Sequence, residues 1–197
     1  MSTSTLPRPA SVARLGVAVL LGALTVTFGA GLVLYVIART GAGSHLVKDA
    51  MHGALPSLPA WLWVSTFVLF VSSAVAFQAM QWARMLLPFQ ARRAFRLAAG
   101  LGWAFVALQV PGLVLLVERY RPAGGERSVV YFLVLFLVGL HLLHAAGGLL
   151  PMTSLARHAS FLREDGPGME RLANVSLYWH FLAGIWLAMF ATFSLVR

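Results

Sequence analysis

The chain of 197 residues contains no cysteine and only six acidic residues, against fifteen lysines and arginines. The lack of cysteine excludes disulfides, thiolate chemistry and cysteine-ligated metals. Charged residues make up only 11% of the chain and hydrophobic residues 59%, whereas a soluble domain carries about 25% charged residues. This composition is typical of an integral membrane protein. The net charge of +9 does not indicate nucleic acid as a partner, because the arginines stand in short stretches between apolar runs, where they set membrane orientation.

Five apolar runs are each long enough to cross a bilayer, which takes about 20 residues. A backbone in hydrocarbon has to satisfy its own polar groups, so each run is expected to be an α-helix. The expected helices cover residues 15–38, 61–83, 97–117, 129–155 and 173–196. The predicted fold class is all-α: a polytopic membrane protein with a single bundle of five transmembrane helices at residues 15–197, preceded by a cytoplasmic tail at residues 1–14.

The basic residues predict the orientation of the bundle. Nine lysines and arginines fall on the N-terminal side of the predicted membrane and six on the other side. The positive-inside rule therefore predicts a cytoplasmic N-terminus. The expected location, which this count does not establish, is the bacterial inner (cytoplasmic) membrane, with the chain as a multi-pass protein. Arg92, Arg93 and Arg96 belong to the largest basic cluster, which is expected to be a short inner loop. Two roles are open to these three on equal terms: contact with phospholipid headgroups or loops of a partner subunit, or solvation in the inner loop.

No aspartate, glutamate, lysine or arginine lies within the five predicted helices. The ionisable side chains at depth, apart from tyrosines, are those of His141, His144 and His180. Proton-coupled carriers usually need an intramembrane carboxylate. The sequence therefore argues against an independent ion or proton transporter.

The three histidines allow three interpretations. His141 and His144 share one face of a helix, and Gly147 and Gly148 follow one turn later, where another backbone can approach closely. The histidines could stabilise the bundle through hydrogen bonds, ligate haem with His180 as the opposing ligand, or bind a metal together. We favour the structural interpretation, because only one histidine is available to face the pair.

His180 is expected to find a hydrogen-bond partner on another helix of the same chain. His141 or His144 is the favoured partner, because two neutral imidazoles can satisfy each other as donor and acceptor.

Several motifs carry a family resemblance. The final predicted helix holds the distinctive tetrad Tyr178-Trp179-His180-Phe181, and the fourth holds His141-Leu142-Leu143-His144 followed by Gly148. Earlier in the chain stand Ser72-Ser73, Leu101-Gly102, Phe105 and Gln109. In these motifs, their order and their spacing, the chain resembles the haem-copper oxidase subunit III family, which serves cytochrome c oxidases and quinol oxidases. It is most similar to the five-helix, quinol-oxidase form.

The resemblance implies a non-catalytic membrane subunit of a haem-copper terminal oxidase in aerobic respiratory electron transport. Such a subunit packs against catalytic subunit I and other oxidase subunits and binds phospholipid. It also implies that haem and copper lie in partner subunits, and that this chain has no catalytic, cofactor-binding or metal-binding residues of its own. Helix-packing roles are expected for His141, His144, Gly147, Gly148, Tyr178, Trp179, His180 and Gly184.

The chain departs from the family pattern at three polar or flexible positions. Leu24 stands where the family typically has an intramembrane acid, Leu142 replaces a glycine, and Ala183 replaces an aspartate. Polar function is lost while packing residues remain, which suits a scaffold or a diverged paralogue, such as the related subunit of some nitric oxide reductases. A small membrane cytochrome b that carries electrons itself is the alternative from another class.

Overall fold

The structure is a computed structural model that describes residues 12–40, 60–119, 129–157 and 167–196. Its helices are α1 (Val12–Thr40), α3 (Ala60–Arg84), α4 (Pro88–Arg119), α5 (Val129–Arg157) and α6 (Pro167–Leu195). All five are long and apolar enough to cross a membrane, and the described residues form no strand. The predicted all-α membrane fold is therefore confirmed. The orientation and the division at residue 15 stay predictions, and most of the expected tail lies outside the described residues.

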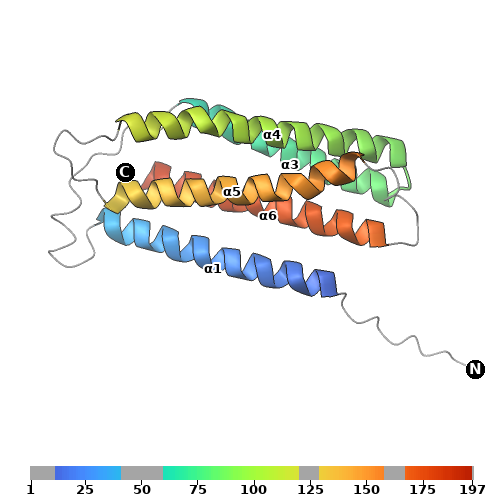
Figure 1. Ribbon diagram of the computed structural model, residues 1–197, viewed down its shortest axis with the longest axis horizontal. Helices are drawn as coiled ribbons and strands as arrows, with labels where there is room; N and C mark the ends of the chain where they lie inside the picture. Colours follow the sequence, from blue (N-terminus) through green and yellow to red (C-terminus); the bar gives the residue numbers. More distant parts are fainter. Residues whose placement is uncertain (1–11, 41–59, 120–128, 158–166, 197) are drawn as a thin grey trace, which may run out of the picture.

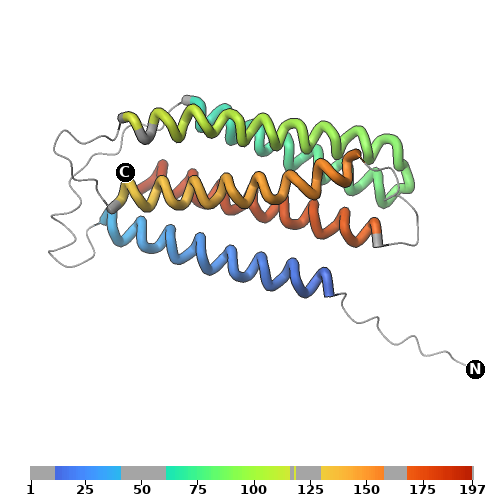
Figure 2. Tube along the Cα trace, in the orientation of Figure 1, coloured from blue at the N-terminus to red at the C-terminus, as the bar shows by residue number. Residues whose placement is uncertain are grey.

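The helices pack as an antiparallel bundle (Figures 1 and 2). α3 and α4 form a hairpin, α5 packs against α4, and α6 packs against both α3 and α5. α1 lies at one side of the bundle and packs against α5 and α6. Successive helices run in opposite directions, so the start of α1, the α3–α4 turn, the end of α5 and the start of α6 gather at one end, on the right in Figure 2.

Two helices begin more than one turn earlier than the hydrophobic pattern predicts. α4 begins at Pro88 and α6 at Pro167, so the prediction that Arg92, Arg93 and Arg96 lie in a loop is wrong. Proline is favoured at the first helical position because its fixed φ suits a helix and its missing N–H is not needed there. Arginine interrupts an apolar run without ending a helix, because its long side chain can reach from a buried stem to the polar end.

A tight turn joins α3 to α4. The N–H of Leu87 donates to the carbonyl of Trp82 at 2.9 Å, and the N–H of Leu86 donates to the carbonyl of Ala83 at 3.2 Å. Leu86 has a φ of 57°, in the left-handed region that glycine usually occupies at the end of a helix. The turn sends α4 back along α3 at once.

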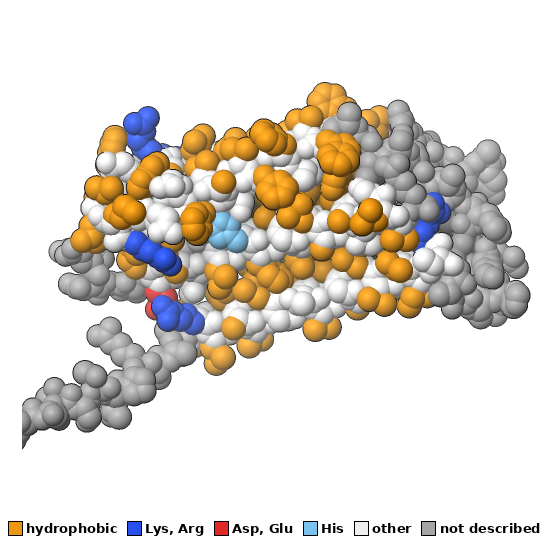
Figure 3. Space-filling view, turned by 180° about the vertical axis from the view of Figure 1, so that it is seen from behind, with side chains coloured by type: hydrophobic (Ala, Val, Ile, Leu, Met, Phe, Trp, Pro, Cys, Tyr) orange, Lys and Arg blue, Asp and Glu red, His pale blue; other side chains and the backbone are white. Residues whose placement is uncertain are grey.

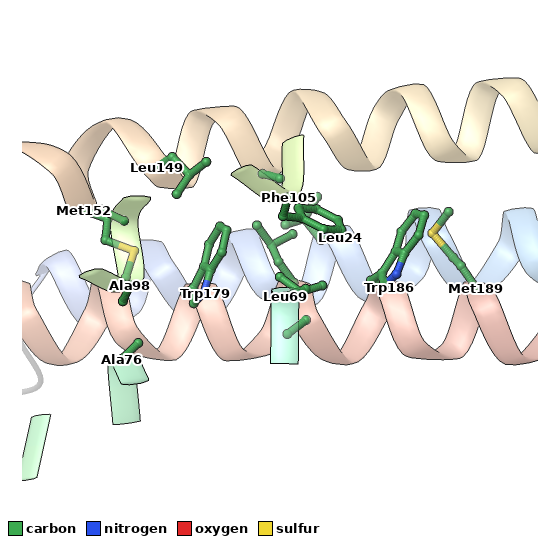
Figure 4. Packing of buried hydrophobic residues seen from close by; sticks show 14 of the residues in the cluster. Leu24, Leu69, Ala76, Ala98, Phe105, Leu149, Met152, Trp179, Trp186 and Met189 are labelled. Atoms are coloured by element: carbon green, nitrogen blue, oxygen red, sulfur yellow. The ribbon is translucent and has the colours of Figure 1, made fainter. Parts of the chain in front are cut away.

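The core is built of small residues between α3 and α4 and of large residues where α6 faces α5 and α4. α3 buries Ala76 and Ala79, and α4 buries Ala94 and Ala98, which lets the two backbones approach closely. Figure 4 shows Trp179 and Trp186 projecting from α6 into the space shared with Leu149 of α5 and Phe105 of α4. These four large residues are almost completely buried.

Candidate functional site

His180 is bound to α3 and not to the other histidines. Its Nδ1 and the hydroxyl of Ser73 are joined by a hydrogen bond of 2.6 Å, and its Nε2 lies 3.3 Å from Ser176 Oγ on its own helix. The prediction of a partner on another helix of this chain is confirmed, and the choice of His141 or His144 is wrong. On a helix, successive side chains point about 100° apart. Tyr178 points toward α5, so His180, two positions later, points to the opposite side.

The His180 ring borders a shallow cavity on the membrane-exposed side of the bundle. The cavity measures about 550 Å³ and is lined by Phe70, Ser73, Ala74, Phe77, Gln78 and His180. Figure 3 shows histidine atoms among hydrophobic side chains on the face opposite to that of Figure 1. The cavity lining places the part-buried pair of His180 and Ser73 at the surface of a membrane-spanning helix bundle, where lipid tails offer it no hydrogen bond.

Trp179 links three helices through one hydroxyl. Its indole N–H donates to Ser72 Oγ at 3.2 Å, and the Ser72 hydroxyl donates to the carbonyl of Ala98 on α4 at 2.8 Å. The ring also lies close to Gly102 of α4, where an added Cβ would stand 3.0 Å from Trp179 Cζ2. Trp179 therefore holds α6 to α3 and α4 at once.

A second set of hydroxyls repeats this arrangement two turns earlier on α3. Trp186 donates its indole N–H to Thr66 Oγ1 at 2.9 Å, and Gln109 of α4 donates to Ser65 Oγ at 2.9 Å. Sequence reasoning noted Gln109 and missed Ser65 and Thr66. The detectable signal was their spacing, because the pairs 65–66 and 72–73 are seven residues apart and so share one helix face.

His141 is enclosed by aromatic rings. It is fully buried, and its ring lies 5.2 Å from that of Trp186, 6.1 Å from that of Phe28 and 6.2 Å from that of Phe105, measured between centroids. Neither ring nitrogen has a hydrogen-bond partner among the described residues. His144 instead forms a hydrogen bond of 2.7 Å between its Nδ1 and the carbonyl oxygen of Leu140 in its own helix.

The histidines do not converge on one centre. His141 lies among the rings of α1, α4 and α6, whereas His180 is held on α3. In the described part of the chain, no group of three or more His, Cys, Asp or Glu side chains is placed to hold a metal ion.

Tyr178 packs on α5 where glycine makes room. Its hydroxyl donates to the carbonyl of His144 at 3.2 Å, and a Cβ added at Gly148 would stand 2.6 Å from Tyr178 Cε1. Gly147 and Gly184 behave differently, because a Cβ added at either would meet nothing within 4 Å. Of the three glycines expected to pack closely, the structure brings Gly148 alone against another helix of this chain.

The three arginines at the start of α4 make different contacts: Arg92 and Arg96 bind the end of α5, and Arg93 does not. Arg92 donates from Nη2 to the carbonyl of Arg157 at 2.8 Å, and Arg96 donates from Nε to the carbonyl of Ala156 at 3.2 Å. These are the last carbonyls of α5, which lack partners within the helix and carry its negative dipole end. Arg93 makes neither bond, and its guanidinium lies 5.8 Å from the centroid of the Phe89 ring.

Over the residues that the structure describes, the fold and these contacts define a multi-pass membrane protein with a bundle of five helices, joined by polar interior side chains. The chain is similar to the cytochrome bo(3) ubiquinol oxidase subunit 3 of Pseudomonas aeruginosa, with 31% identity over 134 residues. The match covers 68% of this chain and 63% of that protein, so the chain spans less than two thirds of its relative. No protein-family model matches the chain. The match supports, at a distant level of identity, the resemblance to the haem-copper oxidase subunit III family.

Proposed function

We propose that this chain is a non-catalytic subunit of a haem-copper terminal oxidase, in the inner membrane of a bacterium. In this role it stabilises the catalytic subunit and binds phospholipid. The similarity to a quinol oxidase subunit 3 supports the class of complex.

One observation carries the proposal: the residues of the final-helix tetrad make contacts between helices. Tyr178 reaches α5, Trp179 reaches α3 and α4, and His180 reaches α3. Side chains used in this way hold a bundle in one shape, which is what a scaffold subunit needs in order to present a fixed surface to its partner.

We further propose that haem and copper are held by partner subunits and not by this chain. Bis-histidine ligation needs two imidazoles that face each other across one site. His141 is enclosed by three aromatic rings from three different helices, and His180 is turned toward Ser73. This geometry favours the scaffold over a small membrane cytochrome b.

Co-purification tests the proposal. The tagged full-length chain is extracted from native membranes in a mild detergent, and the accompanying subunits are identified by mass spectrometry together with the visible spectrum. We expect a haem-copper catalytic subunit and its haem absorption. After harsher detergent separates the subunits, the chain itself is expected to be colourless.

Three results would contradict this assignment. A Soret band that stays with the separated chain would make it a cytochrome. Recovery without any haem-copper subunit would remove it from the oxidases, and recovery with a nitric oxide reductase would assign it to the related paralogue.

A further inference from the structure

The cavity beside His180 has the geometry of a hole that receives one side chain from a facing helix. Four of its lining residues belong to α3 and stand at positions i, i+3, i+4 and i+7: Phe70, Ser73, Ala74 and Phe77. Four residues on one helix face form the hole in knobs-into-holes packing. Gln78 and His180 of α6 complete the lining of this hole, which measures about 550 Å³. A hole of that size fits one large side chain.

The hole is part of a longer exposed stripe on α3. Exposed residues recur there every three or four positions, and together they form the α3 seam: Trp63, Phe67, Phe70, Ala74 and Phe77. The four aromatic members are 48–69% exposed, although α3 packs against α4 and α6. A mean spacing of about 3.5 residues keeps one face turned toward a neighbouring helix that crosses at about 20°. The α3 seam therefore has the pattern of a helix-packing surface without its second helix.

Polar groups lie at the hole, at the depth of the lipid tails. Ser73 and His180 stand near the middles of α3 and α6. Gln78 is exposed about 9 Å along α3 from Arg84, and no hydrogen bond joins it to the described residues. An amide without a hydrogen-bond partner is unfavourable in hydrocarbon, whereas glutamine and serine commonly form hydrogen bonds between membrane helices. These groups fit a neighbour that brings a hydrogen-bonding side chain.

A second copy of this chain does not fill the hole. Copies share one orientation in the membrane, so a twofold contact through the seam sets α3 parallel to α3 and brings equivalent positions together. The second copy then presents its own Ala74 or Ser73 to the hole, and both side chains are far smaller than about 550 Å³. The shape of the seam thus favours a helix from a different chain.

We propose that the α3 seam docks a transmembrane helix of a different chain, which places one large side chain with a hydrogen-bonding tip in the hole. Tyrosine, histidine and glutamine have the required form. Gln78 and the pair of Ser73 and His180 bind the tip, and the aromatic members of the seam pack on the rest of the helix. The proposal rests on the proposed function for the identity of that chain, an oxidase subunit, whereas the docking face follows from α3 and α6 alone.

Filling the hole tests the docking face. Ala74→Leu adds bulk in the hole and leaves the core intact, because Ala74 is exposed. The tagged full-length variant is extracted from native membranes in a mild detergent, and the haem-copper subunit recovered with it is measured relative to the parent. Recovery is expected to fall about 10-fold, because the added bulk overpacks the interface. The matched control, Ala107→Leu, makes the same change at an exposed position of α4 and is expected to retain parental recovery.

Two measurements separate docking from folding. Both leucine variants are expected to keep the far-ultraviolet circular dichroism spectrum of the parent. Gln78→Leu removes no hydrogen bond within the described residues, so its expected loss of recovery, about 3-fold, reports on the hydrogen bond to the docked helix.

Cross-linking identifies the occupant of the hole. Because the chain lacks cysteine, Ala74→Cys carries a photoactivatable cross-linker at one position only. In native membranes it is expected to reach a membrane-spanning helix of an oxidase subunit, within about one turn of a large polar side chain. Leu143→Cys, at an exposed position of α5, is expected not to reach that helix.

Three results would overturn the docking face: equal losses of recovery in the Ala74→Leu and Ala107→Leu variants, a cross-link from Ala74→Cys to lipid alone, and a cross-link that joins two copies of this chain. Failure of the proposed function looks different. The parent would then co-purify with no haem-copper subunit, while Ala74→Cys would still cross-link to a membrane-spanning helix of another identified protein.

Discussion

The bond between Trp179 and Ser72 allows a quantitative test of how α6 is held to α3. Both side chains are almost fully buried, and Ser72→Ala removes the acceptor of the indole N–H. A stranded buried donor costs about 1–3 kcal/mol in water-soluble proteins. Measured couplings between membrane helices are smaller, on average about 0.6 and at most about 1.7 kcal/mol. We expect Ser72→Ala to lower the free energy of unfolding by about 1 kcal/mol, with a coupling to Trp179→Phe of about 0.5–1.5 kcal/mol.

The measurement is a double-mutant cycle on the full-length chain in mixed micelles. Unfolding by increasing mole fraction of sodium dodecyl sulfate is followed by far-ultraviolet circular dichroism, which does not depend on the tryptophan that is replaced. The control cycle pairs Ser72→Ala with Trp186→Phe. Trp186 donates to Thr66 instead, so these two changes should add within about 0.5 kcal/mol. If the Ser72–Trp179 pair is also additive, the hydrogen bond does not hold the helices and the reasoning fails.

Four further predictions follow from the packing and the charge pattern. Gly148→Ala should lower the free energy of unfolding by about 1–3 kcal/mol, because the new methyl group meets the ring of Tyr178. In the same unfolding assay Gly147→Ala, whose methyl group would meet open space, should be neutral or stabilising by up to about 1 kcal/mol. Equal effects of the two substitutions would contradict this packing. His180→Ala removes a partly exposed hydrogen bond to α3 and should cost about 1 kcal/mol. If the chain is the proposed oxidase subunit, assembly should be poorer and haem chemistry per assembled complex unchanged; normal assembly with abolished electron transfer would reopen a redox role. Leu86→Gly relieves a left-handed residue and should raise the free energy of unfolding by about 1 kcal/mol, so a loss of stability would show that the leucine side chain matters more than its backbone. A reporter fused after Arg197 should report from the periplasmic side, and a cytoplasmic signal would contradict the five-span topology.

The number and type of the helices could be predicted from the sequence, because apolar length alone decides what crosses a bilayer. The starts of α4 and α6 could not; in α4 the arginines interrupt the apolar pattern without interrupting the helix. Pro88 and Pro167 were the signals that hydropathy ignores, because each begins a helix.

The partners of the candidate site depended on which helices are neighbours, and one sequence does not contain that information. His180 was expected to meet a histidine on α5, yet its side of α6 faces α3. The serine pair was noticed at the sequence level as part of a resemblance. Only the structure shows what the pair does: Ser72 hydrogen-bonds to Trp179, and Ser73 hydrogen-bonds to His180.

The position of α1 has a consequence for how the protein is made. α1 packs on α5 and α6, yet Pro167 lies 127 positions after Thr40. A ribosome that adds about 5–20 residues per second needs roughly 6–25 s to begin α6 once α1 is complete. Throughout that interval part of its final packing surface does not exist.

α1 therefore has to persist in lipid before its final neighbours are made, without α5 at first and without α6 for the whole interval. Its sequence suits that wait, because the exposed positions are mainly aliphatic and few of its residues are buried in the finished bundle, notably Leu24, Phe28, Tyr35 and Ala38. The hydroxyl of Tyr35 reaches its acceptor, the carbonyl of Val196, only after α6 has been made. Closure of the bundle around α1 therefore follows the synthesis of α6, and the nascent protein is open on that side until then.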